Sequence, residues 1–167
     1  SIALATGLRA SASALATAGR WGESVLTLRR LLANQRVDAG LMRPLAQILL
    51  ARLLARRDRH AEAAALLTDA RPGPGSDIVV VGPWAIAAVE TAWLAGSPDA
   101  ARAHARTALL LGRACDHHVT MAELACYCLR AGLPADPPPD PPGPWRFSLS
   151  GDRARAAEAW AAHGDPY

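Results

Sequence analysis

The chain has 167 residues, of which 51% are hydrophobic and 20% are charged, a composition typical of one globular domain rather than of a disordered chain. All 18 basic residues are arginine, which excludes a Walker phosphate-binding loop because that loop requires lysine. No stretch approaches the roughly 18 consecutive apolar residues of a membrane-spanning helix, and no secretory signal is visible. The three cysteines do not match a secreted disulfide scaffold. We therefore expect a cytoplasmic protein that does not bind membranes.

The net charge of +3 is unevenly distributed along the chain. Residues 1–60 hold ten arginines and three acidic residues, whereas residues 61–167 hold eight arginines and twelve acidic residues. Such asymmetry indicates an anionic partner or an acidic neighbouring domain. A solvent-exposed helix face explains it more simply, and we favour that interpretation.

Apolar residues recur at helical spacing along most of the chain. Near the start, Trp21, Val25 and Leu28 fall on one face of a helix. Alanine and leucine, which are abundant here, have the highest helix propensities. The pattern predicts eight helices, near residues 3–18, 21–35, 41–56, 60–70, 83–95, 98–113, 117–131 and 152–163.

Two segments interrupt the helical pattern. Residues 77–81 (DIVVV) resemble a short strand, but Gly82-Pro83 follows directly and the sequence offers no second strand. We predict a loop or an irregular helix start there. Residues 132–150 contain a run of prolines that cannot form a regular helix. We predict an extended connection between helix pairs, with a proline-motif ligand for a partner protein as the alternative.

The turns between helices recur at a nearly constant spacing. Gly19, Arg57 and Gly96 lie 38 and 39 residues apart, and an alanine- or leucine-rich amphipathic helix follows each turn. A period of about 34–45 residues, with two helices in each unit, is typical of an α-solenoid. We therefore predict an all-α fold, a single domain over residues 1–167 built as a solenoid of tetratricopeptide-like antiparallel helix pairs.

Residues within these turns account for the helix ends. Gly96 and Gly151 are expected in the left-handed conformation that closes a helix. Pro98 suits the first position of the next helix, where its missing N–H costs nothing. Asp58 and Asp152 are expected to cap the N-termini of the helices that follow them.

Residues 115–128 (CDHHVTMAELACYC) are the strongest candidate for a metal site, because zinc binds cysteine and histidine. On a helix, however, Cys115 and Cys126 share a face, whereas Cys128 lies about 200° around from Cys126. We therefore predict three free thiols, no metal ion and no other cofactor, with an all-α metal-binding protein as the alternative. No Ser-His-Asp or Cys-His grouping can be assembled, so we expect no catalytic residue.

Residues 144–167 (PWRFSLSGDRARAAEAWAAHGDPY) combine a proline-rich entry, a Gly-Asp turn, an alanine-rich helix containing Trp160, and a Gly-x-Pro-Tyr continuation. This pattern resembles the C-terminal part of the helical-repeat region in large bacterial LuxR-type transcriptional regulators that carry an AAA or STAND-like NTPase module. Weaker likeness to the same array extends over residues 18–167. Arg153 stands where the family commonly has tryptophan, and Asp165 where it commonly has cysteine. The sequence holds no NTPase motif and no helix-turn-helix, so neither activity is assigned to any residue here.

The resemblance implies a tetratricopeptide-like sensor or scaffold that binds rather than catalyses. Stacked helix pairs would grip a protein, a peptide, an inducer or another domain of the same regulator, and would bias an attached NTPase. The candidate residues of that concave surface are Arg52, Arg56, Arg102 and Arg106. A free-standing tetratricopeptide-like adaptor is the alternative. We expect no direct nucleic-acid contact, because the arginines near Arg56 lack interleaved aromatic residues and a recognition helix.

The last predicted helix carries an apolar stripe of Ala156, Ala157 and Trp160, and the sequence contains no later helix to cover it. An uncapped repeat at the end of a solenoid leaves its apolar face in water. We therefore expect that the chain is part of a longer array and that this helix can mediate self-association.

Overall fold

The computed structural model describes residues 2–34, 40–73, 75–112, 118–135 and 137–163, and all regular secondary structure in these ranges is α-helical. The all-α prediction is confirmed. In this part of the chain the helices are α1 (Ile2–Thr17), α2 (Trp21–Ala33), α3 (Met42–Ala55), α4 (His60–Asp69), α5 (Ile78–Leu94), α6 (Pro98–Gly112), α7 (His118–Arg130), α8 (Trp145–Ser150) and α9 (Arg153–His163). None of them combines the length and the apolar character needed to cross a membrane.

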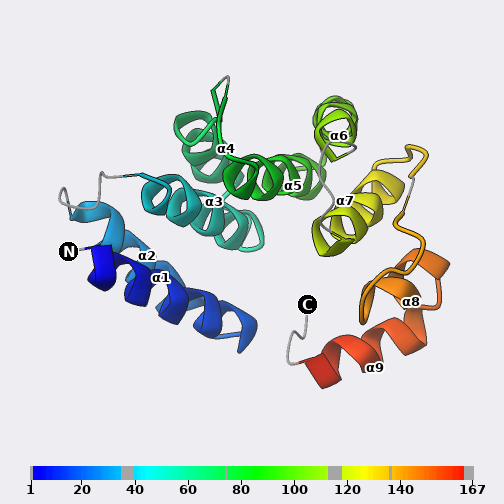
Figure 1. Ribbon diagram of the computed structural model, residues 1–167, viewed down its shortest axis with the longest axis horizontal. Coiled ribbons are helices and arrows are strands. Elements are labelled where there is room, and N and C mark those ends of the chain that lie inside the picture. Colours follow the sequence, from blue (N-terminus) through cyan, green and yellow to red (C-terminus); the bar gives the residue numbers. More distant parts are fainter. Residues whose placement is uncertain (1, 35–39, 74, 113–117, 136, 164–167) are drawn as a thin grey trace.

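The helices follow one another around an arc (Figure 1). The main contacts join helices that are adjacent in the chain, such as α1 with α2 and α5 with α6, or next but one, such as α3 with α5 and α5 with α7. In Figure 1, α4 and α6 lie on the outer side of the arc, and α8 and α9 follow α7 at its C-terminal end. Contacts restricted to near neighbours are what stacked helix pairs produce.

The same backbone turn closes five of the described helices, α8 among them, and the turns that close α1, α3, α5 and α7 recur at a regular spacing. The residue that takes the left-handed conformation is Gly19 after α1, Asp58 after α3, Gly96 after α5 and Gly132 after α7. These residues are spaced 39, 38 and 36 positions apart. In each case the next residue donates its N–H to the carbonyl five residues back, as Arg20 does to Leu15 at 2.8 Å, which is the Schellman motif. The periodicity of the sequence is therefore a periodicity of helix caps.

Asp58 does not cap α4, which corrects one prediction. It occupies the left-handed position of the turn, with φ of 59°, and its carboxylate is 98% exposed. Asp tolerates this conformation better than most residues, because its short side chain is polar. The prediction for Asp152 is confirmed, since its Oδ1 accepts the N–H of Arg155 at 3.2 Å.

Residues 78–81 form the first turn of α5 rather than a loop. Asp77 caps the helix by accepting the N–H of Val79 at 2.9 Å. Pro83 lies inside the helix, where it removes one backbone hydrogen bond. Gly82 lies against α7, because a Cβ atom added to it would be only 3.2 Å from Cγ2 of Thr120. Gly82 and Pro83 therefore lie within α5, whereas the sequence pattern had predicted that the helix starts at Pro83.

The proline-rich connection predicted for residues 132–150 ends earlier than expected. Its last six residues form α8, which begins directly after Pro144. No proline occurs after that point in the segment, so nothing prevents a helix there. Gly151, with φ of 77°, then ends α8 as predicted.

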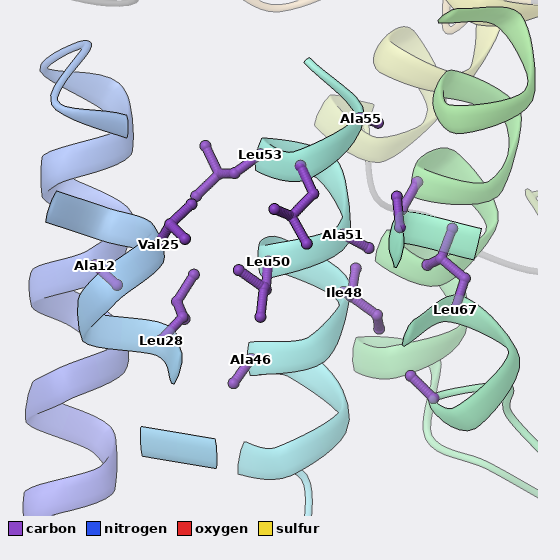
Figure 2. Close-up of a cluster of buried hydrophobic side chains, with 14 of the residues drawn as sticks. Ala12, Val25, Leu28, Ala46, Ile48, Leu50, Ala51, Leu53, Ala55 and Leu67 are labelled. Atoms are coloured by element: carbon purple, nitrogen blue, oxygen red, sulfur yellow. The ribbon is translucent and has the colours of Figure 1, made fainter. Parts of the chain in front are cut away.

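The largest core cluster is centred on α3 (Figure 2). Leu50 and Leu53 point toward Val25 and Leu28 of α2, whereas Ile48 points toward Leu67 of α4. Burial of each large aliphatic side chain contributes about 1.5–3 kcal/mol. α3 is therefore apolar on two sides, which leaves little of its surface for polar residues.

Candidate functional site

A groove of about 560 Å³ lies on the inner side of the arc, and we call it the inner groove. Side chains from α1, α3, α5, α7, α8 and α9 line it, and no described side chain of α2, α4 or α6 does. Its aromatic residues are Trp93, Tyr127, Trp145 and Trp160, and its charged residues include Arg52, Arg56, Glu123 and Arg130. No two neighbouring helices make this site alone, because it depends on the curvature of the array.

A buried ion-pair network forms the floor of the inner groove. Glu90, in the middle of α5, is 1% exposed and accepts from Arg52 of α3 and from Arg56, which directly follows α3. Nε of Arg52 lies 2.5 Å from Oε2 of Glu90, and Nε of Arg56 lies 2.6 Å from Oε1. Nη2 of Arg52 also donates to Glu123 of α7 at 2.6 Å. Three helices are therefore joined by charge-assisted hydrogen bonds.

The network keeps its charges despite burial. Burial alone would raise the pKa of Glu90, but Arg52 and Arg56 outweigh it and hold that pKa below its ordinary value. Burial likewise opposes the charge on Arg52, yet Glu123 and Glu90 raise its pKa well above the usual value. Burial also raises the pKa of Tyr127, so its phenol stays neutral at pH 7. Arg52 and Arg56 are thus largely committed to the protein's own carboxylates.

Arg130, at the C-terminal end of α7, differs from Arg52 and Arg56 because its guanidinium contacts aromatic rings instead of carboxylates. Its guanidinium lies 5.3 Å from the ring centroid of Trp93 and 5.1 Å from that of Tyr127, within the range of cation–π interaction. It forms no ion pair with a carboxylate among the residues that the structure describes. Trp93 is 38% exposed, a high value for tryptophan. This end of the groove therefore offers an available cation beside exposed aromatic surface.

α8 and α9 close the opposite side of the inner groove through two tryptophans. The rings of Trp145 and Trp160 meet edge to face, with centroids 4.6 Å apart, and Nε1 of Trp160 donates to Oγ of Ser148 at 3.1 Å. The apolar stripe of α9 is consequently covered in part by α8, since Ala156 is only 8% exposed. Sequence reasoning missed this cover because α8 lies within the predicted connection.

The structure separates the four candidate arginines into two groups. Arg52 and Arg56 line the inner groove, whereas Arg102 and Arg106 lie on α6, of which no described side chain lines it. Arg102 pairs with Asp99 on the same helix. Sequence reasoning missed Glu90, Trp93 and Arg130. Glu90 did leave a signal, because it is the only charged residue in the apolar segment 78–94.

The described cysteines of the segment 115–128 lie in the core, although Val119, Glu123 and Tyr127 of the same segment line the inner groove. Cys126 and Cys128 are buried free thiols, and burial raises the pKa of each to about 11. Cys115 lies outside the described residues. Within the described ranges, no three His, Cys, Asp or Glu side chains come together as a metal site would require.

Comparisons of the chain with protein-family models, curated proteins and solved structures found no match. The groove combines the exposed ring of Trp93, the half-buried rings of Trp145 and Trp160, a cation without a carboxylate partner in the described chain, and a floor of paired charges. Such a surface is suited to binding an apolar group together with an anionic one.

Proposed function

We propose that this chain is a non-catalytic helical-repeat scaffold whose inner groove binds a peptide segment of a protein partner. The observation that carries the proposal is the groove itself, which receives side chains from six helices along the inner side of the arc. Repeat arrays of helix pairs commonly use such extended concave surfaces for binding.

The aromatic residues of the groove favour a partner segment with large apolar side chains. Tryptophan, tyrosine and arginine are the residues most enriched where interfaces gain their binding energy. Three tryptophans, one tyrosine and Arg130 are gathered here. The edge-to-face contact of Trp145 with Trp160 holds both rings in place before binding, which lowers the entropic cost of association.

Arg130 favours a carboxylate on the same partner segment. Arg52 already pairs with Glu90 and Glu123, and Arg56 with Glu90, so both mainly hold the groove in shape. Arg130 remains exposed on the surface of α7. The segment that fits best therefore places an acidic residue next to an aromatic or aliphatic one.

The family resemblance supports a regulatory setting for this scaffold. We propose that the groove belongs to a cytoplasmic transcriptional regulator in which its occupancy biases an NTPase module. That bias requires the partner to bind one state of the regulator more tightly than the other. Cys126 and Cys128, which are free thiols, support a reducing compartment. A free-standing adaptor would use the same groove without an NTPase.

Selection of peptides from a random display library on the immobilised chain tests the binding function. Enriched peptides should pair an acidic residue with an aromatic or aliphatic one. Trp93→Ala and Arg130→Ala should each lower the affinity for the best-binding peptide by about tenfold. Arg106→Ala on α6 is the matched control and should leave the affinity unchanged. Peptides that bind R130A and W93A as well as the parent chain would refute the proposal.

The same peptide separates a regulator from an adaptor. If the chain belongs to such a regulator, adding a groove-binding peptide to the full-length regulator should change the regulator's rate of ATP hydrolysis, and R130A should abolish that change. A full-length protein that binds the peptide but shows no change in ATP hydrolysis would favour the adaptor.

A further inference from the structure

A second cavity, of about 530 Å³, lies on the other side of α5, between α4, α5 and α6. We call it the outer pocket. α4 and α6 each pack against α5 but are not among the main contacting pairs themselves, and both lie on the outer side of the arc (Figure 1). Helices on the outside of an arc are spread farther apart than those on the inside, so a pocket opens there. Its volume is in the range of small-molecule sites.

The walls of the outer pocket are mostly apolar and well fixed. Leu67 and Ala88 contribute apolar surface, and both are buried. Trp84 is anchored because its Nε1 donates to the carbonyl of Leu67 at 2.8 Å, and the ring of His104 meets it edge to face at 6.3 Å. Burial, and then the charge of Arg71, lower the pKa of His104, so that ring is neutral at pH 7.

Two polar atoms in this lining have no hydrogen-bond partner among the described residues. They are Oγ1 of Thr91, on a residue that is 5% exposed, and Nδ1 of His60. Buried polar groups are nearly always hydrogen-bonded, and leaving one unpaired costs free energy. Other pocket threonines show the usual arrangement, since the hydroxyl of Thr107 donates to the carbonyl of Ala103 at 3.2 Å. Thr91 and His60 therefore stand out within the same cavity.

The two unpaired atoms are both able to hydrogen-bond to a ligand. Nε2 of His60 lies 3.8 Å from Oδ1 of Asp58, beyond hydrogen-bond distance. Nδ1 of His60 accepts in one neutral tautomer and donates in the other. The hydroxyl of Thr91 can donate or accept. A hydroxyl group, which does both, is the smallest ligand group able to satisfy these atoms.

We propose that the outer pocket binds a small, largely apolar molecule that carries a hydroxyl group. The apolar body would lie against Trp84 and Leu67, and the hydroxyl would pair with the buried polar atoms of Thr91 and His60. This site is distinct from the inner groove, so the chain would have separate places for a protein segment and for a small ligand.

Saturation-transfer NMR and titration with 2-naphthol and naphthalene test this proposal, since the two probes differ only in the hydroxyl. The parent chain should bind 2-naphthol about tenfold more tightly than naphthalene. Thr91→Val, which is nearly isosteric, should abolish this preference while leaving naphthalene binding unchanged. Thr107→Val is the matched control, because that hydroxyl already has a partner, and it should bind both probes as the parent does.

Two further variants locate the binding. Ala64→Trp fills the outer pocket from an exposed position of α4 and should block both probes without unfolding the chain. Arg130→Ala in the inner groove should bind both as the parent does. Equal affinity for the two probes in the parent chain, an unchanged preference in T91V, or loss of binding in R130A instead of A64W would overturn the proposal.

Discussion

Two adjacent residues of α5, Glu90 and Thr91, show how differently the two sides of this helix are built. Both are buried. Glu90 pairs with Arg52 and Arg56, which line the inner groove, whereas the hydroxyl of Thr91, beside the outer pocket, has no partner within the described chain. A buried carboxylate that is fully paired is a structural element, because its own protein supplies the opposing charge. An unpaired buried hydroxyl points instead to a group from outside.

The two cavities also differ in what maintains them. The inner groove needs six helices in their places, so its shape depends on the curvature of the whole array. The outer pocket needs only α4, α5, α6 and the turns between them. Changes to the ion-pair network should therefore affect the groove and global stability together, whereas changes in the outer pocket should stay local.

The largest expected effect comes from removing the central carboxylate. Glu90→Ala leaves Arg52 and Arg56 without the charge that they share, and should lower the free energy of unfolding by about 3–5 kcal/mol. Urea denaturation followed by circular dichroism measures it. Glu62→Ala is the control, because Glu62 pairs with Arg29 and Arg59 in solvent and should cost less than about 1 kcal/mol. Equal losses in the two variants would mean that the network does not hold the groove together.

A smaller effect concerns the thiols of α7, which flank Tyr127 but lie in the core. Because burial raises their pKa to about 11 from an ordinary 9.0, their thiolate fraction near pH 8 should be about a hundredfold lower than in the unfolded chain. In a Cys115→Ser background, Cys126 and Cys128 should react correspondingly slowly with a disulfide reagent. Reaction as fast as in guanidinium would show that this wall of the groove opens readily.

Lowering the pH should also reduce the free energy of unfolding through protonation of Glu90, but by less than the Glu90→Ala substitution does. Arg52 and Arg56 hold the pKa of Glu90 below its ordinary 4.5, so its stabilising contribution is complete above that value. It is lost as the pH falls through the lower pKa of the folded state. Urea midpoints of the parent chain and Glu90→Gln should therefore converge as the pH is lowered from about 6 to about 3. A constant difference across that range would contradict the assignment.

The smallest effect is expected on α6. Arg102 forms only a solvent-exposed pair with Asp99, so Arg102→Ala should change stability by less than about 1 kcal/mol. It should also leave the affinity of a groove-binding peptide unchanged in fluorescence titrations. A clear loss of peptide affinity would instead place α6 in the binding surface, as the sequence had suggested.

Several features of this protein were predictable because they depend on local interactions. Alanine and leucine at helical spacing determine most of the helices, and the glycines at 19, 96 and 151 determine where helices end. Pattern reasoning failed where a neighbour overrides local preference. Pro83 stays within α5 because the helix is already started by Asp77 and buried by its neighbours. Asp58 replaces glycine in a turn whose conformation is set by the helix pair around it.

The sites were decided by tertiary structure. The amino-acid sequence alone indicated that the chain is helical and that its turns recur periodically. It could not show that Arg52 lies beside Glu90, 38 residues away, while Arg102 does not reach the groove. Helical spacing defines which residues share a face, but not which face the curved array turns inward. That choice follows from how successive helix pairs pack, because packing brings distant residues into contact on one side of α5 and separates α4 from α6 on the other.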